Sequence, residues 1–90
     1  MNKSEFIRLV TEKTEMAKKD VEKVINEAIE CIIDTVKNDE KVQLVGFGTF
    51  ERRFRASRKG RNPATGEEIT IPALHVPVFK AGKAFKDRVK

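Results

Sequence analysis

Side chains able to do covalent chemistry are few in this sequence of 90 residues. It has a single thiol, Cys31, and a single imidazole, His75. A nucleophilic site needs an activating base within hydrogen-bond reach, and the sequence indicates none beside Cys31. One cysteine by itself also forms neither an internal disulfide nor a metal site. We therefore expect a protein that is not an enzyme and that uses no metal and no cofactor.

The glycine-rich stretch GRNPATGEE has the composition of a phosphate-binding loop. The P-loop, however, requires the spacing G-x-x-x-x-G-K-[ST]. Here five residues separate Gly60 from Gly66, and Glu67 takes the place of the lysine. Because that carboxylate would repel a phosphate, the sequence does not predict a nucleotide-binding loop.

A second stretch, GFGTF, partly imitates the aromatic signature of RNA-binding sheets. Val45 stands where that signature has a cation, and Thr49 replaces its second stacking aromatic. The chain has no Trp and no Tyr that would supply a base-stacking platform elsewhere. Phe47 and Phe50 are therefore interpreted as core residues.

Cationic side chains provide the remaining chemistry. Residues 1–50 carry a net charge of −2, whereas residues 51–90 carry +7. The segment RRFRASRKGR at residues 52–61 has six cations and no acid. Such self-repulsion is relieved by a polyanion, although a solvated charged face is the alternative. Cations that follow a nucleic-acid backbone are provided by Arg53, Arg55, Arg58, Lys59 and Arg61.

The segment RKGRNPATGEE at residues 58–68 has the composition of a hairpin tip. Asn62 has both a donor and an acceptor to offer a groove, and Pro63 is a rigid apolar group without an amide. A proline of this kind can wedge between base pairs and kink a duplex. Prolines are also common in ordinary turns, and the residues alone leave both interpretations open.

The elements that position these residues begin with two helices. Asn2 followed by Glu5 predicts the start of a first helix, and apolar spacings of three and four predict a second over residues 18–38. Ala17 offers that second helix no side-chain cap. Its acidic exposed positions argue against a major-groove recognition helix. Its apolar face is broad enough to need a second copy of the helix as a neighbour.

From Lys41 the apolar period changes to two, which predicts strands. A long strand enters the tip and a return strand runs back to Phe79, with Pro72 and Pro77 tolerated only at sheet edges. The two strands form a hairpin arm with no core of its own, and we expect its distal half to be mobile until a partner orders it. A short basic helix at residues 80–90 ends the chain.

Length and composition fit one intracellular, soluble domain without a signal peptide or a membrane span. Within it we expect a helical dimerisation part at residues 1–40 and a sheet with its arm at residues 41–79. The arm itself covers about residues 53–76.

The chain resembles the bacterial histone-like HU and integration host factor family. The resemblance rests on the spacing F-x-x-F-x-x-x-x-R-x-x-R-x-G-x-N-P-x-T, and it continues through the IPA and PVFKAGKAFK segments. Ala17 and Phe85 depart from the more usual hydroxyl cap and leucine. The residues that fit the spacing are Phe47, Phe50, Arg55, Arg58, Gly60, Asn62, Pro63 and Thr65.

The resemblance implies an α+β fold in an intertwined dimer, in which a helical base supports two β-arms that embrace duplex DNA through the minor groove. It implies that Pro63 intercalates and that Arg55, Arg58, Arg61 and Asn62 contact the groove. It also implies contacts to flanking backbone by Lys3, Lys80, Lys83 and Lys86. The dimer core that follows from the resemblance and the apolar stripe comprises Ile25, Ile29, Ile32, Leu44, Phe47, Phe50 and Phe79.

By that resemblance we expect a nonspecific architectural protein that bends, kinks and compacts DNA in the bacterial nucleoid of the cytoplasm. The expected partners are double-stranded DNA, including kinked, nicked or gapped DNA, and a second copy of the chain. An integration-host-factor-like subunit of an unlike pair is the alternative, and an RNA-binding module is a more remote one, with RNA as a candidate secondary ligand.

Overall fold

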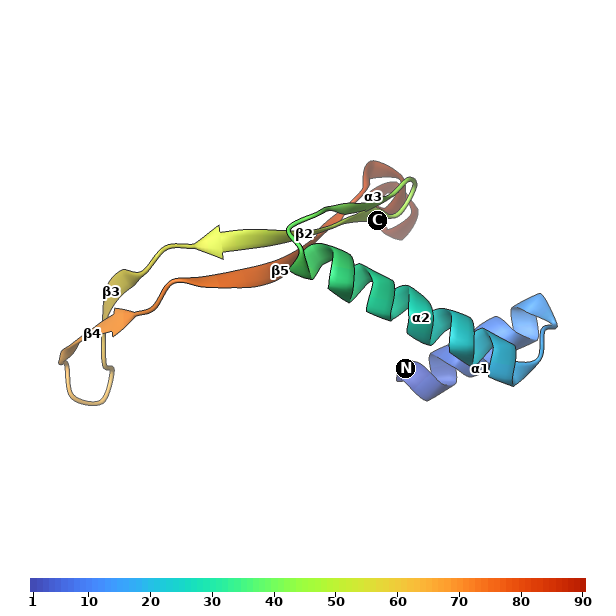
Figure 1. Cartoon of the computed structure of the whole chain (residues 1–90), viewed down its shortest axis with the longest axis horizontal. Coiled ribbons are helices and arrows are strands. Elements are labelled where there is room, and N and C mark those ends of the chain that lie inside the picture. Colours follow the sequence, from blue (N-terminus) through green and yellow to red (C-terminus); the bar gives the residue numbers. More distant parts are fainter. The chain divides into compact units, whose positions relative to one another are not determined.

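The computed structural model describes all residues from Met1 to Lys90. The chain separates into two compact units, Met1–Asp34 and Thr35–Lys90. Figure 1 shows the elements in chain order. Their bounds are α1 Lys3–Thr14, α2 Lys18–Lys37, β1 Val42–Leu44, β2 Gly48–Arg55, β3 Arg58–Arg61, β4 Glu68–Ile71, β5 Leu74–Ala81 and α3 Lys83–Val89. The predicted α+β order of helices, sheet, arm and helix is confirmed.

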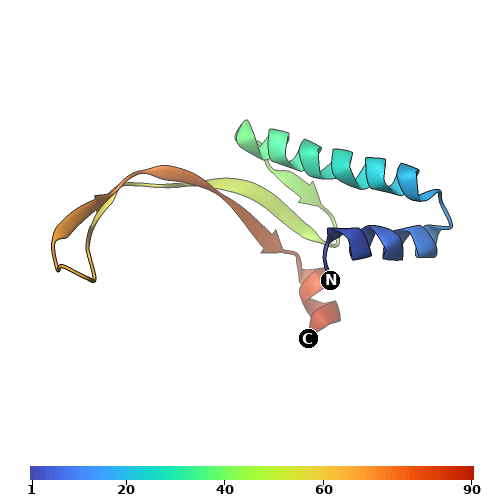
Figure 2. The same ribbon diagram turned by 90° about the horizontal axis from the view of Figure 1, so that it is seen from below.

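The first unit is a helical hairpin in which α1 and α2 lie side by side (Figures 1 and 2). As predicted, Asn2 caps α1, and its Oδ1 accepts a hydrogen bond of 2.9 Å from the Glu5 amide. Glu15 ends α1 in the left-handed region with φ 58°. Ile7 is the buried residue of α1, whereas Phe6 is 48 % exposed.

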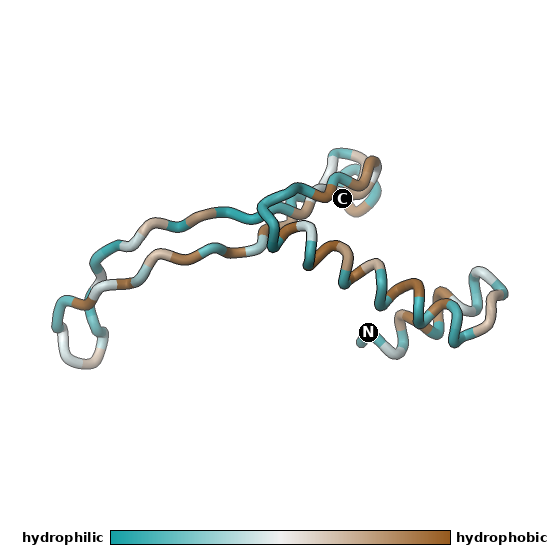
Figure 3. Tube along the Cα trace, viewed as in Figure 1, coloured by the Kyte–Doolittle hydropathy of each residue, from teal (hydrophilic) through white to brown (hydrophobic).

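Helix α2 has the apolar face that its spacing predicts, and apolar turns recur along its whole length in Figure 3. Val21 is buried, but Val24 is 60 % exposed and Ile33 is 52 % exposed. A single chain therefore leaves much of this face in water, where it is available for a neighbour.

The second unit contains a three-stranded antiparallel sheet in the order β1-β2-β5. Strand β2 pairs with β5 from Gly48 opposite Ala81 to Arg55 opposite Leu74. Pro77 lies in β5, which is an edge strand, as its missing amide requires. A cluster of four phenylalanine rings, Phe47, Phe50, Phe79 and Phe85, packs at the end of this sheet nearest α3.

The sequence predicts that each strand of the arm runs without a break, and this prediction is wrong at one point. The ladder stops after Arg55 and resumes at Arg58, where β3 pairs with β4 in a separate two-stranded sheet. Pro72 and Ala73 lie opposite this interruption, between β4 and β5. Because Pro72 has no amide to donate, the ladder loses a hydrogen bond at that point and divides. Figure 2 shows the arm curving towards its tip.

The C-terminal helix begins later than the sequence predicts. Lys80 and Ala81 complete β5, so α3 starts at Lys83 and not at Lys80. Gly82 separates the two elements, and its amide donates to the Phe47 carbonyl oxygen at 2.8 Å. That hydrogen bond holds Gly82 against the turn before β2, so the chain stays in the sheet through Ala81 before α3 begins. None of the helices has the length and apolar character that a bilayer crossing demands.

Candidate nucleic-acid interface

The register of β2 and β5 gives the main sheet two chemically different faces. Side chains alternate between faces along a strand. Phe50, Phe54 and Phe79 share one face with His75, whose ring centroid lies 5.2 Å from that of Phe54. The opposite face, which we call the charged face, carries Glu51, Arg53, Arg55 and Lys80. Arg53, Arg55 and Lys80 are therefore separated from the aromatic cluster by the thickness of the sheet.

Glu51 is the one acid of the charged face, and it is 9 % exposed. Its Oε1 lies 2.6 Å from Lys80 Nζ, and its Oε2 lies 3.5 Å from Lys41 Nζ. The hydrogen bond from Lys80 lowers the pKa of the Glu51 carboxyl, burial opposes it with a smaller effect, and the charges of Lys80 and Lys41 lower the pKa further. Lys80, a predicted backbone contact, is thus engaged within the protein. Lys41 is a member of this cluster that the sequence did not single out.

Arg52 belongs to the basic run but lies on the aromatic side of the sheet. Its Nε is 3.6 Å from Asp39 Oδ1, and its Nη1 donates to the Lys37 carbonyl oxygen at 3.3 Å. A cation at a helix C-terminus satisfies a carbonyl that has no partner in the helix. Arg52 therefore caps the end of α2, and it is not among the predicted DNA contacts.

The predicted arm cations differ in whether they are paired with other groups of the protein. Arg53, Arg55 and Arg58 are exposed and make no ion pair or hydrogen bond within the chain. Lys59 Nζ pairs with Glu68 Oε1 at 3.2 Å, while Arg61 Nη1 donates to the Gly66 carbonyl oxygen at 3.1 Å. Arg61 keeps its net charge, whereas that of Lys59 is compensated.

The tip is closed by its own hydrogen bonds. The Asn62 amide donates to the Glu67 carbonyl oxygen at 2.8 Å, and the Gly66 amide donates to the Asn62 carbonyl oxygen at 2.7 Å. Asn62 Oδ1 accepts from the Ala64 amide at 2.9 Å, which forms an Asx turn around Pro63. Gly66 has φ 75°, which a glycine adopts without strain. Pro63 is exposed at the end of this closed loop, and the Nδ2 of Asn62 remains free to donate.

The predicted dimer core is incompletely covered in one chain. Leu44, Phe47 and Phe79 are 42 %, 43 % and 39 % exposed, and Ile29 is 40 % exposed. Ile25, Ile32 and Phe50 are half-buried. Phe50 and Phe79 lie in register across β2 and β5 with ring centroids 4.7 Å apart. The aromatic rings are thus brought together by the sheet, with one side left open.

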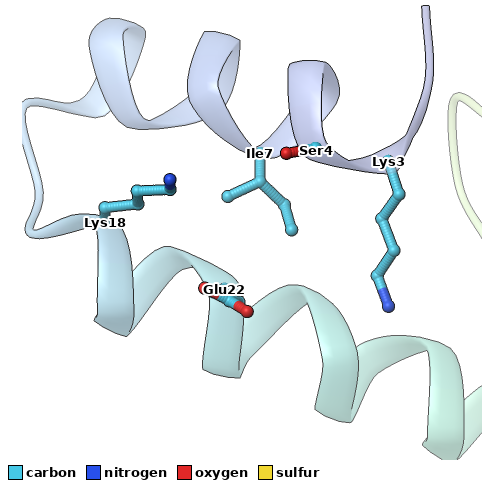
Figure 4. Close-up of a pocket in the computed structure, with 5 residues that line it drawn as sticks. All are labelled: Lys3, Ser4, Ile7, Lys18 and Glu22. Atoms are coloured by element: carbon cyan, nitrogen blue, oxygen red, sulfur yellow. The ribbon is translucent and has the colours of Figure 1, made fainter.

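The remaining predicted contacts lie on the helices. Lys83 and Lys86 are exposed on α3. Lys3 lies at the start of α1 and lines a pocket of about 350 Å³ with Ser4, Ile7, Lys18 and Glu22. Figure 4 shows Lys3 and Lys18 on either side of Ile7. Lys18 was missed by the sequence analysis, because only the helical hairpin brings it to the same pocket as Lys3.

Comparison with known proteins gives full-length similarities. The family model described as bacterial DNA-binding protein matches residues 1–90. DNA-binding protein HU 1 of Bacillus subtilis (strain 168) is 56 % identical over 89 residues, which cover 99 % of this chain and 97 % of the relative. HU of Clostridium pasteurianum is 57 % identical over 89 residues, with 99 % and 98 % covered. A solved Anabaena HU–DNA cocrystal structure superposes with a TM-score of 0.92 at 49 % identity, with 99 % of this chain and 97 % of that chain covered.

Proposed function

The chain belongs to the bacterial HU family of DNA-binding proteins, and we propose from this premise that it is a nonspecific architectural protein that bends and compacts double-stranded DNA. The observation that carries the proposal is the arm, which combines a row of free arginines with a closed, proline-bearing tip. The family is one of non-enzymatic proteins, in agreement with the absence of a predicted nucleophilic site.

Binding in this proposal depends on the phosphate backbone and not on base sequence. Arg53, Arg55 and Arg58 form no ion pair within the chain, so no such pair has to break before they bind a phosphate. Arginine also suits a narrow minor groove, where the negative potential is enhanced. Cations of this kind release condensed counterions, so the logarithm of the binding constant falls by about 0.9 per phosphate neutralised and per tenfold rise in salt.

Bending is assigned to Pro63. The hydrogen bonds within the tip close the loop around Pro63, so the loop itself loses little ordering entropy on binding, whereas we still expect the distal half of the arm that carries it to be ordered by the DNA. An apolar ring without an amide can enter a base step with no donor left unsatisfied. Unstacking costs a few kcal/mol per step, and the bent duplex offsets this cost by contacting more protein surface.

We further propose that the active species is a homodimer. The phenylalanine cluster and the apolar face of α2 are both open in a single chain. A second copy of the chain offers surfaces of the same chemistry, as a two-fold interface requires. The dimer core would include Ile25, Ile29, Ile32, Leu44, Phe47, Phe50 and Phe79. An unlike paralogue is the alternative partner, and sedimentation of the purified chain as a stable folded monomer would contradict both assignments.

The principal test of DNA bending compares Pro63→Ala with Pro77→Ala, which makes the same chemical change in strand β5. We expect Pro63→Ala to weaken binding to intact duplex and to reduce bending, measured by energy transfer between the duplex ends. Binding to nicked or gapped DNA should fall less, because part of the distortion is already present. Equal bending by Pro63→Ala and the wild type would return Pro63 to the role of a turn residue.

Gel shifts at two salt concentrations test whether the arm cations bind the phosphate backbone. Random-sequence duplexes should bind alike, and affinity should fall steeply with salt. Single-stranded RNA of equal charge serves as competitor, since an RNA-binding module is the rival function. Displacement of the duplex by this RNA at moderate salt, or a flat salt dependence, would overturn the proposal. If the proposal holds, DNA in the bacterial nucleoid is where the protein acts.

A further inference from the structure

An acid at the centre of a cationic surface needs an explanation. Glu51 lies on the charged face, two residues before Arg53 and four before Arg55 on the same strand. Cross-strand ion pairs commonly stabilise sheets, but such a role needs one partner. Glu51 instead engages two lysines from two different segments, with one carboxylate oxygen for each.

We propose that Glu51 holds Lys41 and Lys80 as a compensated cluster, which limits the affinity of the charged face for DNA. This inference rests on the proposed function. The cluster has a net charge of +1, so it neutralises one phosphate where two free lysines would neutralise two. Arg53 and Arg55, which have no internal partner, then carry the greater part of the attraction on this face.

The environment of Glu51 makes the compensation durable. The side chain of Glu51 is 11 % exposed, and the shorter of its two contacts is 2.6 Å. The pair between Lys59 and Glu68 in the arm is different, since both side chains are mostly exposed. Exposed pairs are weak and are readily exchanged for other partners. Lys41 and Lys80 are also exposed, at 70 % and 58 %, but the carboxylate that they share is not, and a shielded carboxylate is costly to leave unpaired. A phosphate therefore does not easily displace Glu51 from its lysines.

An affinity limit has a physical use in a nonspecific binder. A protein that covers DNA without choosing sites must also leave it when other proteins arrive, and each further phosphate contact steepens its dependence on salt. Removal of the Glu51 charge tests the idea directly. In Glu51→Gln the cluster gains one positive charge per subunit, while the side chain keeps its size.

We expect Glu51→Gln to bind duplex DNA more tightly than the wild type, with a salt slope steeper by about 0.9 per subunit, or about 1.8 for a dimer. The ratio of variant to wild-type affinity should then grow about sixtyfold for each tenfold fall in salt. Glu30→Gln, on the exposed surface of α2, makes the same change in net charge without freeing a lysine and should leave the slope unchanged. The double variant Glu51→Gln, Lys80→Gln should return to the wild-type slope.

A second variant keeps the test decisive if Glu51→Gln does not fold, as judged by circular dichroism. Lys41→Gln leaves Glu51 with Lys80 alone, and the slope should become shallower by about 0.9 per subunit. A wild-type protein that binds with a steep slope, together with an unchanged or shallower slope in Glu51→Gln, overturns the inference alone. A wild-type protein with no salt-dependent affinity for duplex DNA overturns the proposed function instead.

Discussion

Gly48 is the residue at which one added methyl group should do the most damage to the fold. A Cβ at this position would lie 2.5 Å from the Lys80 carbonyl oxygen and 2.6 Å from two ring carbons of Phe79. Neither neighbour can move freely, because Lys80 is paired in β5 and the Phe79 ring packs against Phe47 and Phe50. Gly48→Ala therefore forces β2 away from β5 at the root of the arm.

Overpacking of this kind costs about 3 kcal/mol, at the upper end of the usual range because one neighbour is backbone. The total stability expected for a chain of this length is about 5 to 13 kcal/mol. The midpoint of thermal unfolding should therefore fall by about 12 to 24 °C. Circular dichroism during heating measures the shift, with all variants at one protein concentration because a dimer's midpoint depends on concentration.

Gly46→Ala is the matched control, since Gly46 lies in the turn directly before β2 but has no atom within 4 Å of its added Cβ. Its cost arises only from the φ of 87°, which an alanine tolerates at about 1 kcal/mol. The midpoint should fall by about 4 to 8 °C. If Gly48→Ala lowers the midpoint no more than Gly46→Ala, the close approach of β2 and β5 is not what makes glycine necessary at residue 48.

Three further changes test separate parts of the structure. Glu15→Gly should raise the free energy of unfolding by about 1 kcal/mol in denaturant titrations, because Glu15 has φ 58° at the end of α1; no gain would show that this strain is relieved elsewhere. Asn62→Ala removes the acceptor of the Ala64 amide and should reduce DNA bending in energy-transfer assays, more than Thr65→Ala, which loses only a 3.3 Å bond. The ion pairs of Glu51 lower the pKa of its carboxyl, so the stability they contribute is present above its ordinary value of 4.5 and is lost as the pH falls through the lowered value. The difference in unfolding free energy between the wild type and Glu51→Gln should therefore be constant near neutrality and shrink in acid, and a difference independent of pH would contradict the ion-pair assignment.

The sequence predicted the elements well wherever one local signal decides the structure. Asn2 caps α1, the apolar spacing fixes α2, and the period of two locates the strands. It was wrong at Lys80, where we expected the basic C-terminal helix to begin, because pairing with Thr49 keeps this residue in β5. It also missed the interruption opposite Pro72, which depends on the register of two strands that are far apart in the sequence.

The sequence could predict which residues belong to the candidate site, but not which of them form ion pairs within the protein. Residue types identify Arg53, Arg55 and Pro63 as candidates for DNA contact. They do not reveal that Glu51 joins Lys41 to Lys80, since these residues come from three segments that meet only in the folded sheet. Counting charges along a sequence therefore overestimates the number of cations that are free to meet a phosphate.

The arm shows how large this overestimate is. Six cations between residues 52 and 61 would give a salt slope of about 5.4 per arm if each neutralised one phosphate. Arg52 is paired with Asp39 and Lys59 with Glu68, which leaves four uncompensated cations and a slope of about 3.6.

Variants of the neighbouring residues Arg58 and Lys59 can decide between these two estimates of the salt slope. Arg58→Gln should lower the slope by about 0.9 per subunit, because Arg58 has no acid beside it. Lys59→Gln should change the slope far less, because Glu68 already offsets the charge of Lys59 in the wild type and the pair neutralises no phosphate. Equal losses from the two variants would mean that Glu68 leaves Lys59 when DNA binds, and that the ion pairs of the free protein do not determine which of its cations bind DNA.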